Sequence, residues 1–153
     1  MSQTLRVRVY YDLASTLCYV AHRALQRSEG PIAALGIELA FTPLDLCRLV
    51  GGFRAGAEVD ERRRQNAARV AEELAVEVRV PRAWPHGRAL AATALLAEPL
   101  GRGASWRERA FSAVFEEGLL DADANVAACL AREISLELTP DAIEGALPLL
   151  DQQ

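Results

Sequence analysis

The stretch YYDLASTLCYVAHRAL, residues 10–25, contains the point at which a strand pattern gives way to a helix pattern. Apolar and polar side chains alternate over residues 5–11, which is the period of a β-strand with one buried face. From Leu17 to Leu25 the apolar residues recur three and four positions apart, as on one face of a helix. Ser15 stands between the two patterns, where its hydroxyl can accept the backbone N–H of Cys18 as an N-cap. A helix that begins directly after a strand presents free N–H groups and a positive dipole end, which stabilise thiolates and other anions, so we expect any chemistry here.

A second alternating stretch, residues 37–42, predicts another strand that ends at Pro43. The sequence SEGP at residues 28–31 is expected to break the helix before it. Two strands joined by a helix form a βαβ unit, so the strands should be parallel with a right-handed crossover.

The chain from residue 60 onward shows helical patterns and no convincing strand. The expected helix boundaries are an N-cap at Asp60, a start at Arg88, a capping box of Ser105 with Glu108, an N-cap at Asp123, and a last helix from Thr139 that Pro148 stops.

Composition limits the classes of partner. The chain has 153 residues and a formal net charge of −4, which suits a single domain and provides no general attraction for nucleic acid. The basic run Arg62-Arg63-Arg64 is flanked by acidic residues, as on a solvated helix face. Neither a signal peptide nor an apolar stretch long enough to span a membrane is recognisable, so we expect a cytoplasmic protein without membrane attachment.

The three cysteines form no CxxC pair, and the sequence therefore predicts free thiols. Cys18 would be the third residue of its helix, where the dipole end should lower the pKa of the thiol. Cys47 and Cys129 have apolar neighbours and are expected to be buried small hydrophobes. His22 lies one turn after Cys18, so a Cys–His pair is geometrically allowed, but a partly exposed histidine is the simpler expectation. No further ligands lie nearby, and we predict no metal site.

The chain resembles the DsbA-like branch of the thioredoxin superfamily in four features taken together. These are Tyr11-Asp12 at the end of a strand, Ser15-Thr16-Leu17-Cys18 at the start of a helix, the second strand, and the helical remainder. The similarity is greatest to 2-hydroxychromene-2-carboxylate isomerases and kappa-class glutathione transferases. It extends through FTPL at residues 41–44, PRAWP at residues 81–85, and the segment from Phe111 to Gly118. Redox members carry Cys-Pro-X-Cys-Tyr at residues 15–19, and isomerase members carry Ser-Pro-Tyr-Ser at residues 15–18.

The resemblance implies an α/β, incomplete thioredoxin-like (DsbA-like) fold in one domain, residues 1–153, with a βαβ part over residues 1–50 and a helical part over residues 60–150. The chain departs from the family at Thr16, where proline is usual, and at Gln153, where the family would continue into a half that contains a cis-proline. Without that half, the strand Leu5–Tyr11 would keep an open edge, so we expect a homodimer or a partner chain to cover it.

The resemblance also implies a glutathione-dependent isomerase or transferase. In it Ser15 would donate a hydrogen bond to the glutathione sulfur and favour its thiolate, with Thr16, Leu17 and His86 nearby and the cofactor weakly bound. Ser15 as a simple N-cap stays open as an alternative, as does a non-catalytic binding or scaffold protein. A third alternative is a monothiol redox protein that uses Cys18, although a dithiol cycle is not expected because Cys18 has no attacking partner at position 15.

Overall fold

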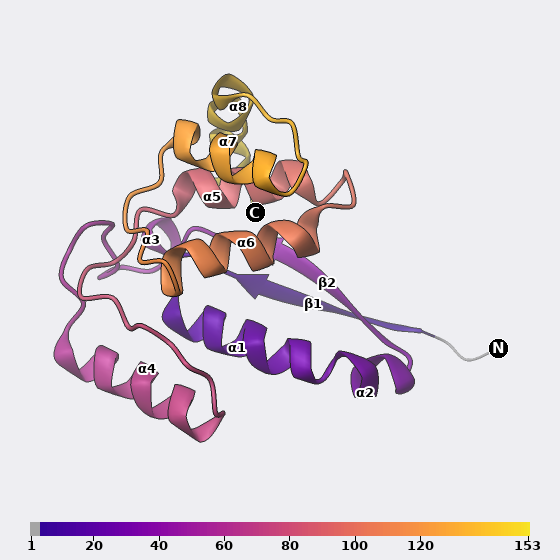
Figure 1. Ribbon diagram of the computed structural model, residues 1–153, viewed down its shortest axis with the longest axis vertical. Helices are drawn as coiled ribbons and strands as arrows, with labels where there is room; N and C mark the ends of the chain where they lie inside the picture. The colour runs from indigo at the N-terminus through magenta and orange to yellow at the C-terminus, as the bar shows by residue number, and fades with distance from the viewer. Residues whose placement is uncertain (1–3) are drawn as a thin grey trace.

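The computed structural model describes residues 4–153. The elements in chain order are β1 (Leu5–Tyr11), α1 (Thr16–Arg27), α2 (Glu29–Ala34), β2 (Ile37–Pro43), α3 (Leu46–Leu49), α4 (Glu61–Glu73), α5 (Arg88–Ala97), α6 (Gly103–Phe115), α7 (Ala124–Glu133) and α8 (Pro140–Leu150). In the view of Figure 1, α1 and α2 lie below the two strands, α6 and then α5, α7 and α8 lie above them, and α4 lies beside α1.

The two strands are parallel, with Leu5 opposite Ile37 and Tyr11 opposite Pro43, which confirms the predicted βαβ unit. Strand β1 is buried only at its carboxyl end, since Leu5 is 60% exposed and Tyr11 is 5% exposed. Within residues 4–153, β1 pairs with β2 alone, and its second edge therefore carries unpaired backbone groups.

Strand β1 and helices α1 and α6 meet in an aromatic cluster. The Phe111 ring of α6 lies 6.2 Å from Tyr11 and 6.0 Å from Tyr19, and Phe115 stacks on Tyr19 at 5.1 Å. Aromatic pairs at these separations add to the free energy gained by burial. Because these contacts join the strand, the first helix and the helical part, they fix the start of α1 relative to the rest of the chain.

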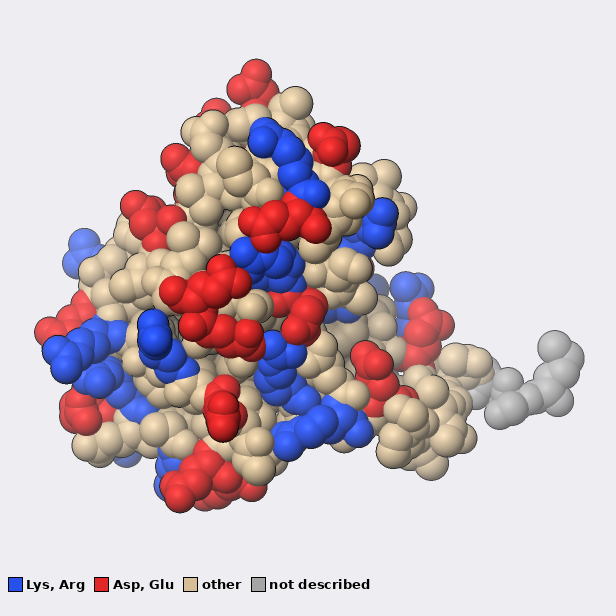
Figure 2. All heavy atoms as spheres, in the orientation of Figure 1, with Lys and Arg blue, Asp and Glu red and all other residues tan. Residues whose placement is uncertain are grey.

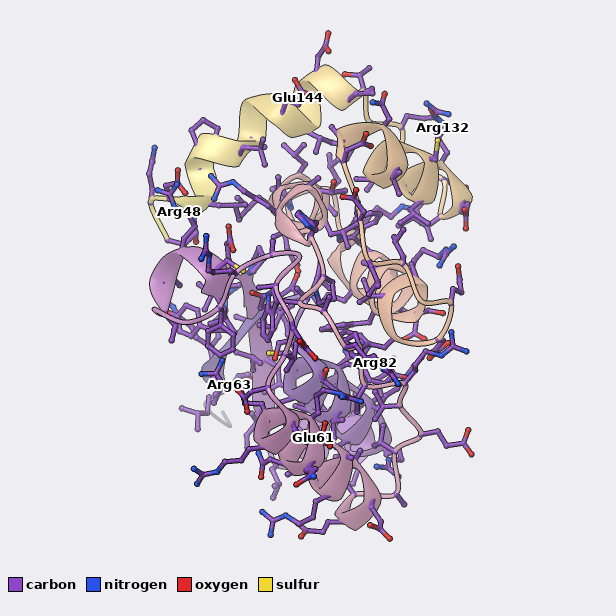
Figure 3. All side chains as sticks on the ribbon, turned by 90° about the vertical axis from the view of Figure 1, so that its left-hand side faces the viewer. Arg48, Glu61, Arg63, Arg82, Arg132 and Glu144 are labelled. Atoms are coloured by element: carbon purple, nitrogen blue, oxygen red, sulfur yellow. The ribbon has the colours of Figure 1, made fainter. Side chains whose placement is uncertain are left out.

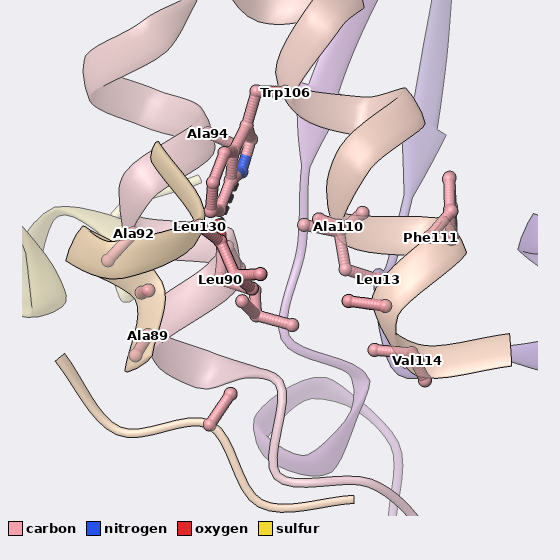
Figure 4. Packing of buried hydrophobic residues seen from close by; sticks show 14 of the residues in the cluster. Leu13, Ala89, Leu90, Ala92, Ala94, Trp106, Ala110, Phe111, Val114 and Leu130 are labelled. Atoms are coloured by element: carbon pink, nitrogen blue, oxygen red, sulfur yellow. Dashed lines mark hydrogen bonds between the residues drawn. The ribbon is translucent and has the colours of Figure 1, made fainter. Parts of the chain in front are cut away.

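Helix α5 lies at the centre of the helical part, because its small side chains allow other helices to approach it closely. Its buried residues are mainly alanines, which let α6, α7 and α8 pack closely around it. Trp106 of α6 is fully buried against this helix, and its indole N–H donates to the Leu90 carbonyl at 3.0 Å (Figure 4). Trp106 therefore joins α6 to α5 by packing and by one hydrogen bond.

Several predicted helix starts are confirmed by their capping bonds. The side chains of Asp60, Asp123 and Thr139 each accept the backbone N–H three residues later, as N-caps do. The predicted capping box at Ser105 is wrong, because α6 already begins at Gly103. The carboxylate of Glu98 lies over Gly103, in the space that a β-carbon would fill, so a tertiary contact occupies this helix start.

The predicted break after the first helix is confirmed, because α1 ends at Arg27 and Ser28 is its C-cap. Residues 29–31 already belong to α2, a short helix that the sequence did not predict. The predicted stop at Pro148 is wrong. Pro148 lies inside α8, which continues to Leu150. Proline so close to a helix end removes a single interior hydrogen bond, a cost that the burial of Ile143, Ala146 and Leu150 against the core can offset.

Acidic and basic side chains are intermixed on the face shown in Figure 2. Arg23 of α1 binds the carboxylates of Glu108 on α6 and of Glu116, the C-cap of α6, and Arg109 binds Glu117 and Glu133. In the basic run, Arg63 and Arg64 form ion pairs with acidic residues at the start of α4, which agrees with a solvated helix face. None of the helices in residues 4–153 combines the length and the apolar character that crossing a membrane would need.

Candidate functional site

The turn between β1 and α1 is organised by Asp12, which the sequence analysis named at the strand end but gave no structural role. Its buried carboxylate accepts the backbone N–H of Ala14 at 2.6 Å and that of Leu46 at 2.7 Å. The first bond is a local turn contact, and the aspartate two residues before Ala14 is the signal that could have revealed it. The second bond attaches the start of α3 to the turn, so Asp12 holds two segments in place around Ser15.

Ser15 is the N-cap of α1, as predicted. Its backbone is extended, its hydroxyl oxygen accepts the N–H of Cys18 at 3.3 Å, and the residue is 7% exposed. Only the oxygen takes part in this cap, so the single hydroxyl hydrogen is left for another acceptor, either the Cys18 sulfur or a bound group. The free N–H groups and the dipole of α1 are directed at the same place.

Cys18 does not have the predicted acidity. Its sulfur accepts the backbone N–H of Asp12 at 3.5 Å, so the thiol points toward the turn between β1 and α1. Burial raises the pKa of this thiol and outweighs the Ser15 hydroxyl and the Asp12 N–H, which favour the thiolate. The expected lowering of the pKa is therefore wrong, because the helix position alone does not reveal the lost solvation.

A cavity of about 270 Å³ lies beside Ser15. Its polar lining comes from Ser15, Thr16, Arg63, Arg64, Asn66 and Trp84, and its apolar lining includes Leu17 and Phe53. We call it the Ser15 cavity. Among residues 4–153 no acidic side chain lines it, and its charged lining groups are those of Arg63 and Arg64.

The aromatic wall of the Ser15 cavity is a pair of rings. Phe53 and Trp84 lie 4.5 Å apart, and the guanidinium of Arg63 lies 4.6 Å from the Phe53 ring centre. Figure 3 shows Arg63 at the start of α4, on the side of the helix that faces α3. The Nε atom of Arg64 is buried without a hydrogen-bond partner among the described residues. The indole N–H of Trp84 is also buried, and it is directed at the Cys47 thiol, on the side of the neighbouring cavity.

The structure brings Ser15, Thr16 and Leu17 together in this cavity but not His86. His86 is exposed and lines a neighbouring cavity of about 770 Å³, together with Asp12 and Cys47. Its backbone N–H donates to the Leu120 carbonyl at 2.8 Å. Trp84 lines both cavities and forms the wall between them.

The remaining candidate residues lie elsewhere. Cys47 is half-buried, and burial raises the pKa of its thiol. Cys129 is exposed on α7, so the prediction that it is buried is wrong. His22 is buried, not partly exposed, and its ring lies 3.1 Å from the Glu108 carboxylate and 5.0 Å from the Phe111 ring centre. Within residues 4–153 no cluster of histidine, cysteine and acidic side chains has the composition of a metal site.

Comparisons of sequence reveal no matching family model and no matching curated protein. Comparisons of structure do. A 2-hydroxychromene-2-carboxylate isomerase is similar with a TM-score of 0.69 and 17% identity over 97% of this chain and 77% of that one. A probable DsbA oxidoreductase from Streptomyces coelicolor is similar with a TM-score of 0.64 and 17% identity over 94% of this chain and 68% of that one. The expected resemblance is confirmed at the level of the fold: the chain has an α/β thioredoxin-like fold of the DsbA type.

Proposed function

We propose that this protein is an isomerase or transferase that uses a thiol cofactor, glutathione, and acts on a small anionic electrophile in the Ser15 cavity. The observation that carries the proposal is the position of the Ser15 hydroxyl, at the N-terminus of α1 and in a cavity without acidic residues. One of the similar structures is an isomerase named for a chromene carboxylate, a compound of this class.

Ser15 would hold the cofactor sulfur. Its hydroxyl donates a hydrogen bond to the thiolate, and the positive end of the α1 dipole favours the ionised form over the neutral thiol. Both effects lower the pKa of the bound thiol and raise the fraction that is nucleophilic at neutral pH. Bound glutathione would supply a nucleophilic thiolate for reversible addition to an unsaturated carbon conjugated to a carbonyl, which would give an isomer after elimination or a transfer product after protonation.

Arg63 and Arg64 are suited to attract the substrate. A carboxylate in the Ser15 cavity would meet two guanidinium groups and no acidic side chain of the described residues. The Phe53 and Trp84 rings offer a surface for a planar apolar body. Cys18 takes no part as a nucleophile in this scheme, since burial keeps its thiol protonated.

Titration calorimetry with glutathione tests the proposal. We expect binding that weakens at least about tenfold in Ser15→Ala and in Ser15→Asp, because aspartate keeps the helix cap but lacks the hydroxyl donor and repels a thiolate. Thr139→Ala is the matched control, since it removes an equivalent N-cap from α8 and leaves the site intact.

The outcomes separate the alternatives. Absence of heat at millimolar glutathione removes the proposal. Binding that both Ser15 variants retain would leave Ser15 as an N-cap only. Binding without turnover of any conjugated carboxylate would identify a non-catalytic binding protein, and insulin reduction lost in Cys18→Ser would identify a monothiol redox protein.

A further inference from the structure

Asp12 is a buried titratable group that the proposed chemistry does not use, and its hydrogen bonds lead to the Ser15 cavity. One carboxylate oxygen, Oδ1, accepts the Ala14 N–H at 2.6 Å, and the other, Oδ2, accepts the Leu46 N–H at 2.7 Å. Ala14 and Leu46 both line the Ser15 cavity, whereas Asp12 lines the neighbouring cavity of about 770 Å³ and not the Ser15 cavity. Asp12 therefore acts on the Ser15 cavity through two backbone groups.

The bond to Leu46 fixes the start of one wall of the Ser15 cavity. The segment of residues 46–59 forms this wall and contributes Leu46, Phe53 and Val59 to the lining. Its later part is held separately, since the Gly56 N–H donates to the Trp84 carbonyl at 2.8 Å. Its first backbone N–H is held by the Asp12 carboxylate, so a change at this carboxylate acts on the start of the wall.

A proton on the Asp12 carboxylate weakens one of the two bonds. Each oxygen accepts one N–H, and the protonated oxygen becomes a hydroxyl donor and a much poorer acceptor. The bond to Ala14 closes a turn of two residues, whereas the bond to Leu46 joins segments 34 residues apart. Because the local bond orders fewer residues, we expect protonation to break the bond to Leu46.

The charge of Asp12 changes within the ordinary range of pH. Burial raises the pKa of its carboxyl group to about 6, and the negative charge of Asp45, the N-cap of α3, acts in the same direction. Burial also raises the pKa values of the adjacent Cys18 and Cys47 thiols, which stay protonated there. The other charged or titratable side chains that line the neighbouring cavity are Arg48, His86, Arg88, Asp121, Asp123 and Glu144. Asp12 therefore changes charge between about pH 5 and pH 7 beside two thiols that do not.

We propose that Asp12 is a positioning residue of the Ser15 cavity: its carboxylate holds Leu46 where the cavity binds its ligand, and its protonated form releases Leu46. The affinity of the Ser15 cavity for its ligand then falls as the pH falls from about 7 to about 5. The identity of that ligand, glutathione, rests on the function proposed above, whereas the two hydrogen bonds of Asp12 do not.

Nuclear magnetic resonance of the ¹⁵N-labelled protein without ligand tests the hydrogen bonds directly. We expect the amide protons of Ala14 and Leu46 to shift upfield as the pH falls, with a midpoint near pH 6, because a neutral acceptor forms the weaker hydrogen bond. The amides of Ser15 and Phe53 should follow the same titration, because the wall moves with Leu46. Asp12→Asn should abolish this titration, since asparagine has a single oxygen and does not ionise.

Titration calorimetry with glutathione at pH 5 and pH 7 measures the consequence for binding. Asp12→Asn resembles the protonated state at both pH values. We expect it to bind about tenfold more weakly than the unmodified protein at pH 7 and within about twofold of it at pH 5. Ionisation of the glutathione thiol is common to both proteins and cancels in this ratio. His86→Gln is the control, because histidine commonly titrates in this range, and it should keep the pH dependence of the unmodified protein.

The two measurements separate the role of Asp12 from the proposed function. If glutathione gives no heat at either pH, the proposed function fails, and the amide titration of the free protein still decides the role of Asp12. Constant shifts at Ser15 and Phe53 during a titration of Ala14 and Leu46 would overturn the inference. A ratio of affinities that is the same at pH 5 and pH 7 would overturn it as well.

Discussion

The buried carboxyl group of Asp12 fixes the turn before α1 and makes the free energy of unfolding depend on pH. Burial raises its pKa from the usual 3.8 to about 6, even though the N–H groups of Leu46 and Ala14 favour the carboxylate. The folded state therefore binds a proton more tightly than the unfolded state between these two values. In this range the unfolded state has fewer bound protons, so the free energy of unfolding falls as the pH rises.

We predict that the free energy of unfolding falls less between about pH 4 and pH 6 in Asp12→Asn than in the unmodified protein, because the asparagine side chain does not ionise. Urea unfolding at pH 4, 5, 6 and 7, followed by the fluorescence of buried Trp106, measures it. Other titrating groups are common to both proteins and cancel in the comparison. Equal pH slopes for the two proteins would show that Asp12 is not the source.

The three thiols should differ in reactivity. Cys129 is exposed, whereas burial raises the pKa values of Cys18 and Cys47. Since the thiolate is the reactive form, we expect iodoacetamide to modify Cys129 at least about tenfold faster than Cys18 at pH 7.5. Peptide mass spectrometry of timed samples measures the rates, with Cys129→Ser as the control for assignment. Faster modification of Cys18 would restore the monothiol redox alternative.

At the scale of an element, the start of α6 depends on one glycine. A β-carbon on Gly103 would collide with the Glu98 carboxylate, whereas one on Gly145 of α8 would meet nothing within 4 Å. We predict that Gly103→Ala destabilises the protein by about 1–3 kcal/mol because Glu98 must leave Arg107, with which it forms an ion pair. Gly145→Ala should stabilise it by about 0.5–1 kcal/mol, since alanine is the better helix former.

Thermal and urea unfolding of these two variants check the prediction, each against the unmodified protein. A Gly103→Ala protein as stable as the parent would mean that Glu98 has another favourable position. The comparison isolates the tertiary contact, because both substitutions replace a helical glycine by the same residue.

At the scale of the whole molecule, the open edge of β1 is the feature at which a second chain could pair. The backbone N–H of Leu5 donates to the Gly36 carbonyl, and the carbonyl of Tyr11 accepts from the Leu44 N–H. The backbone groups of the odd-numbered residues of β1 therefore face β2. The backbone groups of Arg6, Arg8 and Tyr10 therefore point to the open edge, because successive residues of a strand alternate in direction. Such an edge readily pairs with another strand.

We predict a dimer in which two copies pair through this edge, since closed two-fold dimers are the most frequent assemblies. Size-exclusion chromatography with light scattering measures the mass. Arg8→Pro should produce a folded monomer, because it removes a donor from the open edge only. Val7→Pro is the contrasting variant, since it removes a donor that faces β2 and should destabilise the fold. A monomer of 16.6 kDa at micromolar concentration would contradict the prediction.

The sequence by itself determined the features that depend on near neighbours. The alternation in β1 and β2 and the caps at Ser15, Asp60, Asp123 and Thr139 follow from residues within one or two turns of each other. The resemblance to DsbA-type proteins was recognised from short segments spread over residues 11–118. Helix capping and strand period are local, so no distant residue has to be known in advance.

The tertiary structure decided everything that depends on burial. His22 lies against Glu108, 86 residues away, and burial raises the pKa of the Cys18 thiol; both effects come from contacts that no local pattern contains. The same is true of the Ser15 cavity, which several separate elements enclose. Desolvation and exclusion of water require atoms on all sides of a group, and only the folded chain supplies them.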